Sequence, residues 1–273
     1  MTRSVRRPRR LLQLAGAGAA ALMALSACSS SSDAKDTTSD TSNSASPKLS
    51  GNVTVFAAAS LKESFTTLGK EFEKQHPGTK VSFNFGGSDT LAASITGGAP
   101  ADVFAAASPK TMAIVTDKKD AVGTPATFVR NQLEIATLPG NPDKVSSLKD
   151  LTKSGLKVVL CDKTVPCGAA AQKALDAGKL KLTPVSYEQD VKAALNKVEL
   201  KEADAAVVYK TDVKSAAGKV EGVEFPESAE AINDYPIVLL KNAPNAQAAK
   251  AFIALVQSAE GQKVLGEAGF LKP

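Results

Sequence analysis

Small residues and a serine lie where a predicted strand passes into a predicted helix. Residues 53–60, VTVFAAAS, run from strand-forming residues into three alanines and Ser60, and Glu63 follows three positions later. This spacing is typical of a capping box, in which the serine hydroxyl and the Glu63 carboxylate each accept a backbone N–H at the helix start. A helix that begins where a strand ends also directs free N–H groups and the positive end of its dipole towards an anion. The segment is therefore interpreted either as a helix cap or as part of an anion site.

The same kind of sequence follows three further predicted strands. GGS ends at Ser88, VPCG surrounds Cys167, and one strand ends at Tyr209. Small residues let a ligand approach the backbone closely, and in open α/β sheets ligands bind at the carboxyl ends of strands. Each segment alone is typical of an ordinary turn, so it is their repetition that predicts a ligand site.

The sequence lacks the motifs of the common enzyme classes. There is no G-x-S-x-G, no P-loop and no G-x-G-x-x-G after a strand, and the S-x-x-K pattern at 154–157 overlaps the only KTG-like triplet. The single histidine, His76, lies in a predicted turn, and no metal-binding cluster is evident. We therefore predict that the protein is not an enzyme and uses no cofactor. An esterase-like use of Ser60 is the alternative, and it would require a base near that hydroxyl.

Strands and helices alternate along residues 51–273. Apolar side chains at helical spacing predict a helix over 60–75, for example Phe65, Leu68 and Phe72. Strands are expected at 53–56, 81–85, 102–106, 133–138, 157–161, 205–209 and 234–241, and two helices at 244–257 and 259–267. This alternation predicts an α/β fold with parallel strands.

Residues 1–27 have the pattern of a signal peptide. Five arginines precede an apolar run, LLQLAGAGAAALMAL, which is short for a membrane-spanning helix. The Leu-Ser-Ala-Cys that follows resembles a bacterial lipobox, which implies cleavage before Cys28 and a lipid on its sulfur. An ordinary secretory signal is the alternative. Residues 28–50 are rich in Ser, Thr and Asp, so we expect them to form a flexible tether.

The net charge of +5 arises in the predicted signal peptide. The chain has 33 Lys and Arg against 28 Asp and Glu, and five arginines but no acid lie in residues 1–27. Removing those five leaves 28 basic and 28 acidic residues. A neutral body without a basic aromatic patch gives no reason to expect nucleic-acid binding.

Two cysteines, Cys161 and Cys167, lie in the segment CDKTVPC. Export would place them where disulfides form, so a disulfide across this short loop is predicted. Such a bond would hold the Cys167 amide in a fixed position. Two free buried thiols are the alternative, because strand and helix directions can keep the Cβ atoms apart.

Six segments together resemble one known family. VTVFAAASL, GGSDTL, GAPADVFAAAS, VPCG, QDV and AVVYKTD occur in the order found in periplasmic molybdate-binding proteins, the substrate-binding components of molybdate ABC importers. The resemblance implies a two-lobed periplasmic-binding-protein fold of type II, with a ligand cleft between lobes that are joined by two crossing segments. Lobe one is then 51–129 plus 235–273 and lobe two is 130–234, with the hinge near 127–131 and 233–236.

The resemblance also implies a ligand and its contacts. Molybdate or tungstate would be held through its oxygens, with no direct metal ligand, by neutral donors at Ser60, Ser88, Cys167, Val191 and Tyr209. The two serines would use hydroxyl and amide, Cys167 and Val191 the amide, and Tyr209 the hydroxyl. The three alanines before Ser60 would leave room for the ligand, and cavity size would select against the smaller sulfate.

The setting implied by the resemblance is extracytoplasmic. The protein would be a monomer, anchored to the cell membrane by the lipid on Cys28, and would deliver its ligand to an ABC importer permease. Asp89 follows Ser88 and is expected to point outward or to cap its helix, because a carboxylate facing a dianion would repel it. Another tetrahedral oxyanion, such as sulfate or phosphate, is the alternative ligand, and a structural lipoprotein with an empty cleft is the alternative class.

Overall fold

The computed structural model describes residues 48–273. The predicted signal peptide, Cys28 and residues 28–47 of the predicted tether lie outside the described residues. At the end of that tether, Leu49 packs against the core and the Ser50 carbonyl accepts a hydrogen bond from Asn245 Nδ2 at 2.8 Å. Within 48–273, no helix combines the length and the apolar character that crossing a membrane requires.

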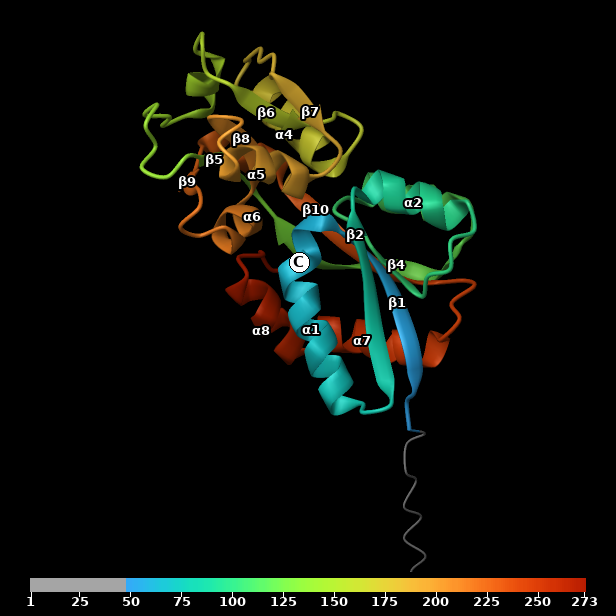
Figure 1. Ribbon diagram of the computed structural model, residues 1–273. Coiled ribbons are helices and arrows are strands. Elements are labelled where there is room, and N and C mark those ends of the chain that lie inside the picture. The colour runs from blue at the N-terminus through green and yellow to red at the C-terminus, as the bar shows by residue number, and fades with distance from the viewer. Residues whose placement is uncertain (1–47) are drawn as a thin grey trace, which may run out of the picture. The chain divides into compact units, whose positions relative to one another are not determined.

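The first sheet has five strands in the order β2-β1-β3-β10-β4 (Figure 1). Its first three members pair in parallel, whereas β10 runs antiparallel to both β3 and β4, so the sheet is mixed rather than purely parallel. The strands are β1 (Gly51–Ala58), β2 (Thr79–Gly86), β3 (Val103–Ala105), β4 (Ala121–Asn131) and β10 (Asn233–Leu240).

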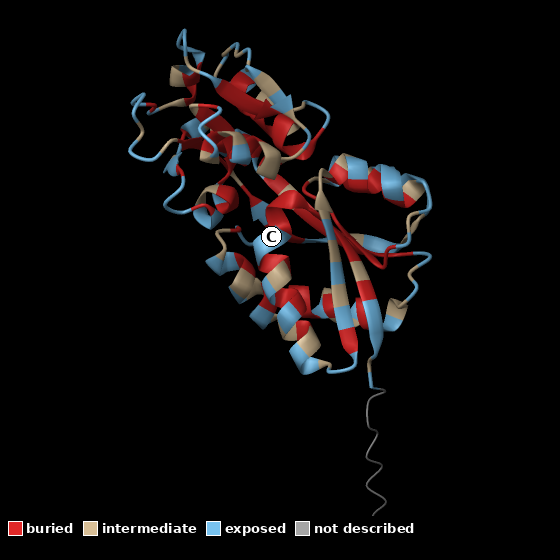
Figure 2. Ribbon diagram, in the orientation of Figure 1, coloured by how far each residue is buried: buried red, intermediate tan, exposed pale blue. Residues whose placement is uncertain are grey.

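Helices cover both faces of this sheet, and each contributes an apolar stripe. In α1 (Lys62–Gln75), Phe65, Leu68 and Phe72 recur at helical spacing and are fully buried, as an amphipathic helix on a sheet requires. They pack with α7 (Ala246–Gln257) and α8 (Ala259–Glu267), whereas α2 (Ser88–Thr96) and α3 (Pro109–Asp117) belong to a separate apolar cluster. Figure 2 shows the buried residues concentrated along the strands and on the helix sides that face them.

The second sheet also has five strands, in the order β7-β6-β8-β5-β9. One continuous apolar cluster surrounds it. Its strands are β5 (Leu133–Thr137), β6 (Val158–Cys161), β7 (Ser186–Glu188), β8 (Ala205–Tyr209) and β9 (Glu221–Val223). Its helices are α4 (Pro166–Ala177), α5 (Val191–Glu199) and α6 (Lys210–Ser215), with 3₁₀ turns η2 (Leu148–Thr152) and η3 (Pro226–Ala231).

The chain passes between the two sheets along neighbouring strands. It leaves the first sheet at the end of β4, whose last residue is Asn131, and returns at the start of β10, whose first residue is Asn233. These two asparagines face each other in the antiparallel β4–β10 register. Both passages therefore lie side by side, a placement that later bears on the site.

The predicted capping box at Ser60 is wrong. Residues Ala59–Leu61 form a 3₁₀ turn, η1, and α1 begins at Lys62 without a side-chain cap. The Ser60 hydroxyl instead lies 2.9 Å from the Tyr235 hydroxyl. By contrast, α3 does begin with a side-chain cap: the Ser108 side chain accepts from the Thr111 amide, and a proline lies in the first turn.

Candidate functional site

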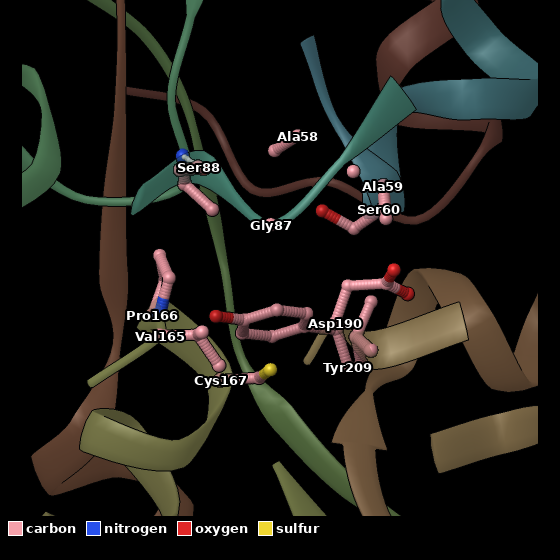
Figure 3. Close-up of a pocket in the computed structure, with 13 residues that line it drawn as sticks. Ala58, Ala59, Ser60, Gly87, Ser88, Val165, Pro166, Cys167, Asp190 and Tyr209 are labelled. Atoms are coloured by element: carbon pink, nitrogen blue, oxygen red, sulfur yellow. Dashed lines mark hydrogen bonds between the residues drawn. The ribbon is translucent and has the colours of Figure 1, made fainter. Parts of the chain in front are cut away.

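A small cavity lies between elements of the two sheets, with about 20 Å³ of water-accessible space (Figure 3). That exceeds the roughly 10–15 Å³ that a single water needs. All five residues predicted to bind an oxyanion line it, and none of them is more than 4% exposed: Ser60, Ser88, Cys167, Val191 and Tyr209. The sequence motifs that seemed separate along the chain therefore meet at one buried point.

Residues with little or no side chain form much of the wall on the side of the first sheet. They are Ala58, Ala59, Gly86, Gly87 and Ala107. A Cβ added at Gly87 would lie 2.6 Å from the carbonyl oxygen of Gln189, in the segment just before α5. Only glycine lets these two backbone segments approach so closely, so Gly87 helps to close the cavity.

Four helical segments begin at the cavity and direct backbone amides towards it. Ser60 lies in η1, Ser88 opens α2, Cys167 lies in the first turn of α4, and Val191 opens α5. The first amides of a helix have no partner within the helix, and its N-terminus carries the positive end of the dipole. Converging N-termini of this kind favour an anion without any positively charged side chain.

Two hydroxyl groups at the cavity are held so that their protons remain free. Ser88 Oγ accepts from the Ala107 amide at 3.0 Å, and Tyr209 Oη accepts from Asn233 Nδ2 at 2.7 Å. The same Asn233 nitrogen lies 3.4 Å from the Pro166 carbonyl, which can only accept, so this atom is the NH₂ group. Each hydroxyl thus has its own hydrogen to donate to a ligand.

Burial keeps both nearby tyrosines protonated. It raises the pKa of the Tyr209 hydroxyl well above its ordinary value of 10.0. It likewise raises the pKa of Tyr235. Neither hydroxyl ionises at physiological pH, so both serve as neutral hydrogen-bond donors.

Two carboxylates near the cavity take different positions. Asp89 was expected to point outward or to cap its helix. It is absent from the cavity lining and makes no side-chain cap for α2, and its Oδ1 is buried without a hydrogen-bond partner in the structure. Asp190 does line the cavity and was not predicted as a site residue. Its Oδ1 accepts from the Ala193 amide at 2.9 Å, which engages this carboxylate in capping α5.

An ion-pair cluster lies beside the cavity. Lys192 Nζ of α5 is 3.0 Å from a Glu63 carboxylate oxygen of α1 and 3.2 Å from Asp212 Oδ1 of α6. Asp212 is fully buried, and its Oδ2 accepts from the Tyr209 amide at 3.2 Å. Burial raises the pKa of Asp212 to about 6 although Lys192 opposes the shift. The pairing with Asp212 and Glu63 outweighs desolvation for the lysine, whose pKa is also raised.

Cys161 and Cys167 form a disulfide in the structure. The bond joins the end of β6 to the first turn of α4, so it connects the sheet directly to the segment that carries the Cys167 amide. In the part of the chain that the structure describes, no group of three or more His, Cys, Asp or Glu side chains could hold a metal ion.

Sequence reasoning missed the residues that support these donors. Tyr235, Asn131 and Asn233 are buried and reach the cavity hydroxyls directly or through one another. Their only signal was position, because all three fall in the predicted crossing segments. Lys192 follows the QDV motif, but nothing in its spacing pointed to partners in α1 and α6.

Comparisons with known proteins agree with this architecture. Residues 53–271 match the family model described as bacterial extracellular solute-binding protein. The molybdate-binding protein ModA of Mycobacterium tuberculosis is 42% identical over 222 residues, which cover 81% of this chain and 85% of that protein.

Solved structures give the same result. The substrate binding domain of a putative molybdenum ABC transporter from Clostridium difficile is 32% identical with a TM-score of 0.61, covering 82% of this chain and all 100% of that one. The periplasmic molybdate-binding protein of Azotobacter vinelandii has a TM-score of 0.71 at 22% identity, covering 81% and 99%, and supports the fold alone. The predicted resemblance and the α/β binding-protein fold are thereby confirmed, and a solute-binding family rather than an enzyme family matches the chain.

Proposed function

Because this chain belongs to the family of bacterial extracellular solute-binding proteins, we propose that it binds molybdate outside the cytoplasm and delivers it to the permease of an ABC importer. The observation that carries the proposal is the buried cavity where four helix starts and two free hydroxyl donors converge. The relatives named for molybdate support the choice of ligand.

The proposed ligand contacts are the five cavity residues Ser60, Ser88, Cys167, Val191 and Tyr209. Molybdate is a tetrahedral dianion, so donors on several sides each meet one oxygen, and the protein binds the oxygens rather than the metal. Molybdate is then the cargo, and no cofactor takes part. Tungstate has the same charge and shape, so the same donors serve both anions.

The proposed mechanism of capture is closure of two lobes. Lobe one comprises 51–129 plus 235–273, lobe two comprises 130–234, and the crossing segments 127–131 and 233–236 act as the hinge. Donors at Ser60 and Ser88 lie on the side of the first sheet, whereas Cys167, Val191 and Tyr209 lie on the side of the second. An anion that contacts both sets therefore stabilises the closed arrangement, because an open one offers only one of the two sets to the anion.

The proposed attachment to the membrane is a lipid on Cys28, with residues 28–50 as the tether and the folded body as a monomer. Such a tether would keep the binding protein close to its permease. It concentrates the partner locally without adding contacts to the interface.

Isothermal titration calorimetry with molybdate, tungstate, sulfate and phosphate tests the proposed ligand. We expect tight binding of molybdate and tungstate and weak or no binding of the other two, because a smaller anion cannot reach all donors at hydrogen-bond distance. The variant Tyr187→Phe, which removes the hydroxyl of a tyrosine that is 43% exposed and does not line the cavity, serves as a control and should bind the four anions as the wild type does. Tighter binding of sulfate or phosphate than of molybdate would replace the proposed ligand, and heat from none of the four would refute oxyanion binding.

A further inference from the structure

We propose that Tyr235, held by Asn131, is a positioning residue that directs the Ser60 hydroxyl proton towards the bound anion. The proposal rests on the proposed function, because it assumes that an oxyanion occupies the cavity. Tyr235 is not among the residues that line the cavity. It acts through Ser60, whose Oγ lies 2.9 Å from Tyr235 Oη with both residues buried.

The orientation of the Asn131 amide is fixed by its neighbours. Asn131 Oδ1 accepts from the Gln132 backbone N–H at 3.0 Å, and a backbone N–H can only donate. The other atom is therefore the NH₂ group, and it lies 2.8 Å from Thr211 Oγ1 and 3.4 Å from Tyr235 Oη. Tyr235 Oη thus receives a hydrogen from Asn131.

The direction assigned to the bond between Tyr235 and Ser60 rests on this and on distance. Tyr235 Oη accepts from Asn131 and has one hydrogen to donate, and Ser60 Oγ lies 2.9 Å away as an acceptor for it. Ser60 Oγ then accepts, so its own hydrogen is free for the cavity. Without the Tyr235 hydroxyl, the serine could turn its hydrogen towards a nearby backbone carbonyl, as serines at helix starts commonly do.

The Tyr209 hydroxyl is also oriented by an asparagine of the crossing strands. Asn233, the register partner of Asn131, donates to Tyr209 Oη, so this bond does not use the Tyr209 hydrogen. One asparagine of the pair therefore orients a donor directly and the other does so through Tyr235. The same strands that connect the two sheets also hold the two hydroxyls ready to donate before an anion arrives, which reduces the ordering cost of binding.

A double-mutant cycle with molybdate tests the role of Tyr235. Tyr235→Phe keeps the ring in its fully buried position and leaves the Asn131 nitrogen bonded to Thr211. We expect Tyr235→Phe to weaken molybdate binding about tenfold in the wild-type background. In the Ser60→Ala background, where there is no hydroxyl to orient, the same change should alter the affinity by less than about twofold. The exposed Tyr187→Phe should leave the affinity unchanged in both backgrounds.

A merely structural role would give a different pattern. Loss of packing or strain at Tyr235 would weaken binding by the same factor with or without the Ser60 hydroxyl, and this additive result would overturn the proposal. An unchanged affinity in Tyr235→Phe would overturn it as well. The wild-type titration separates the two claims: if sulfate or phosphate binds in place of molybdate, the proposed ligand is wrong and the same cycle with that anion decides the role of Tyr235. A wild type that binds none of these anions overturns both.

Discussion

Lys192 should stabilise the protein in a strongly pH-dependent way, and Lys192→Met tests this. Its ammonium group lies 3.2 Å from the fully buried Asp212 and 3.0 Å from Glu63, and the lysine is itself mostly buried. Methionine keeps the apolar stem but removes the charge. Asp212 would then remain buried without its cation, and removing one partner of a buried pair leaves a charge that must be neutralised.

The magnitude follows from the pKa of Asp212. Burial raises it from 3.8 to about 6 in the folded protein. Because the folded-state pKa is the higher one, the stability associated with this group is complete below about pH 4 and is lost as the pH rises through about 6. At 1.36 kcal/mol per pKa unit, the ionisation of Asp212 lowers the free energy of unfolding of the wild type by about 3 kcal/mol at pH 7, compared with its value below about pH 4.

Without Lys192, desolvation and the Glu63 charge still raise the pKa of Asp212 and only the Tyr209 amide still lowers it, so the pKa rises further. In the limiting case the carboxyl stays fully protonated at pH 7 and 8. Because Asp212 ionises with a pKa of 3.8 in the unfolded chain, keeping it protonated in the folded protein at pH 7 lowers the free energy of unfolding by about 4.4 kcal/mol. The variant should therefore be less stable than the wild type by up to about 1.4 kcal/mol at pH 7 and by up to nearly 3 kcal/mol at pH 8. Near pH 5 the difference should almost vanish, because Asp212 is protonated in both proteins.

Urea denaturation at pH 5, 7 and 8 measures these differences as free energies of unfolding. Lys197→Met is the matched control, because Lys197 lies on the same helix and pairs with Glu202 on the surface, where an ion pair contributes little. Its effect should be small at every pH. An equal loss of stability in Lys192→Met at pH 5 and pH 8 would refute the reasoning, since it would show that the ionisation of Asp212 is not involved.

The remaining predictions concern the ligand, the anchor and the disulfide. Tyr209→Phe should weaken molybdate binding by about 1.5–3 kcal/mol, the value of one hydrogen bond to a charged group; unchanged affinity in calorimetry would leave Tyr209 as a packed aromatic residue only. Cys28→Ala should appear in the medium or as unprocessed precursor in cell fractionation, and a processed variant retained in the membrane would contradict lipidation at that cysteine. Mass spectrometry of the non-reduced, exported protein should find Cys161 and Cys167 linked, in contrast to two thiols that alkylate without reduction.

The strands that the sequence predicted best are those whose limits are set locally. β8 was predicted at 205–209 and is observed at Ala205–Tyr209, and all five of its residues are buried. β6, predicted at 157–161, is observed at Val158–Cys161. Continuous apolar runs bounded by polar or turn residues specify such strands without information from elsewhere in the chain.

β4 shows why other elements could not be predicted. No strand was predicted there, the segment contains Gly123 and Pro125, and most of its first seven residues are exposed. Its pairing with β10, which begins about a hundred residues later, makes it a strand. Register shifts in that ladder accommodate residues that disfavour regular strands. A partner so distant in sequence leaves no periodic signal in β4 itself.

The failed capping box at Ser60 is the most informative difference, because it bears on how the site works. Helices away from the cavity do use side-chain caps: Ser108 caps α3 and Ser258 caps α8. Of the helical segments that open at the cavity, η1, α2 and α4 have no such cap, whereas α5 is capped by Asp190. A capping side chain satisfies one of the orphan amides that a helix start offers, so an uncapped start leaves these donors for a ligand. Tyr235 keeps the Ser60 oxygen engaged elsewhere, so the serine does not compete with an anion for the amides of its own helix.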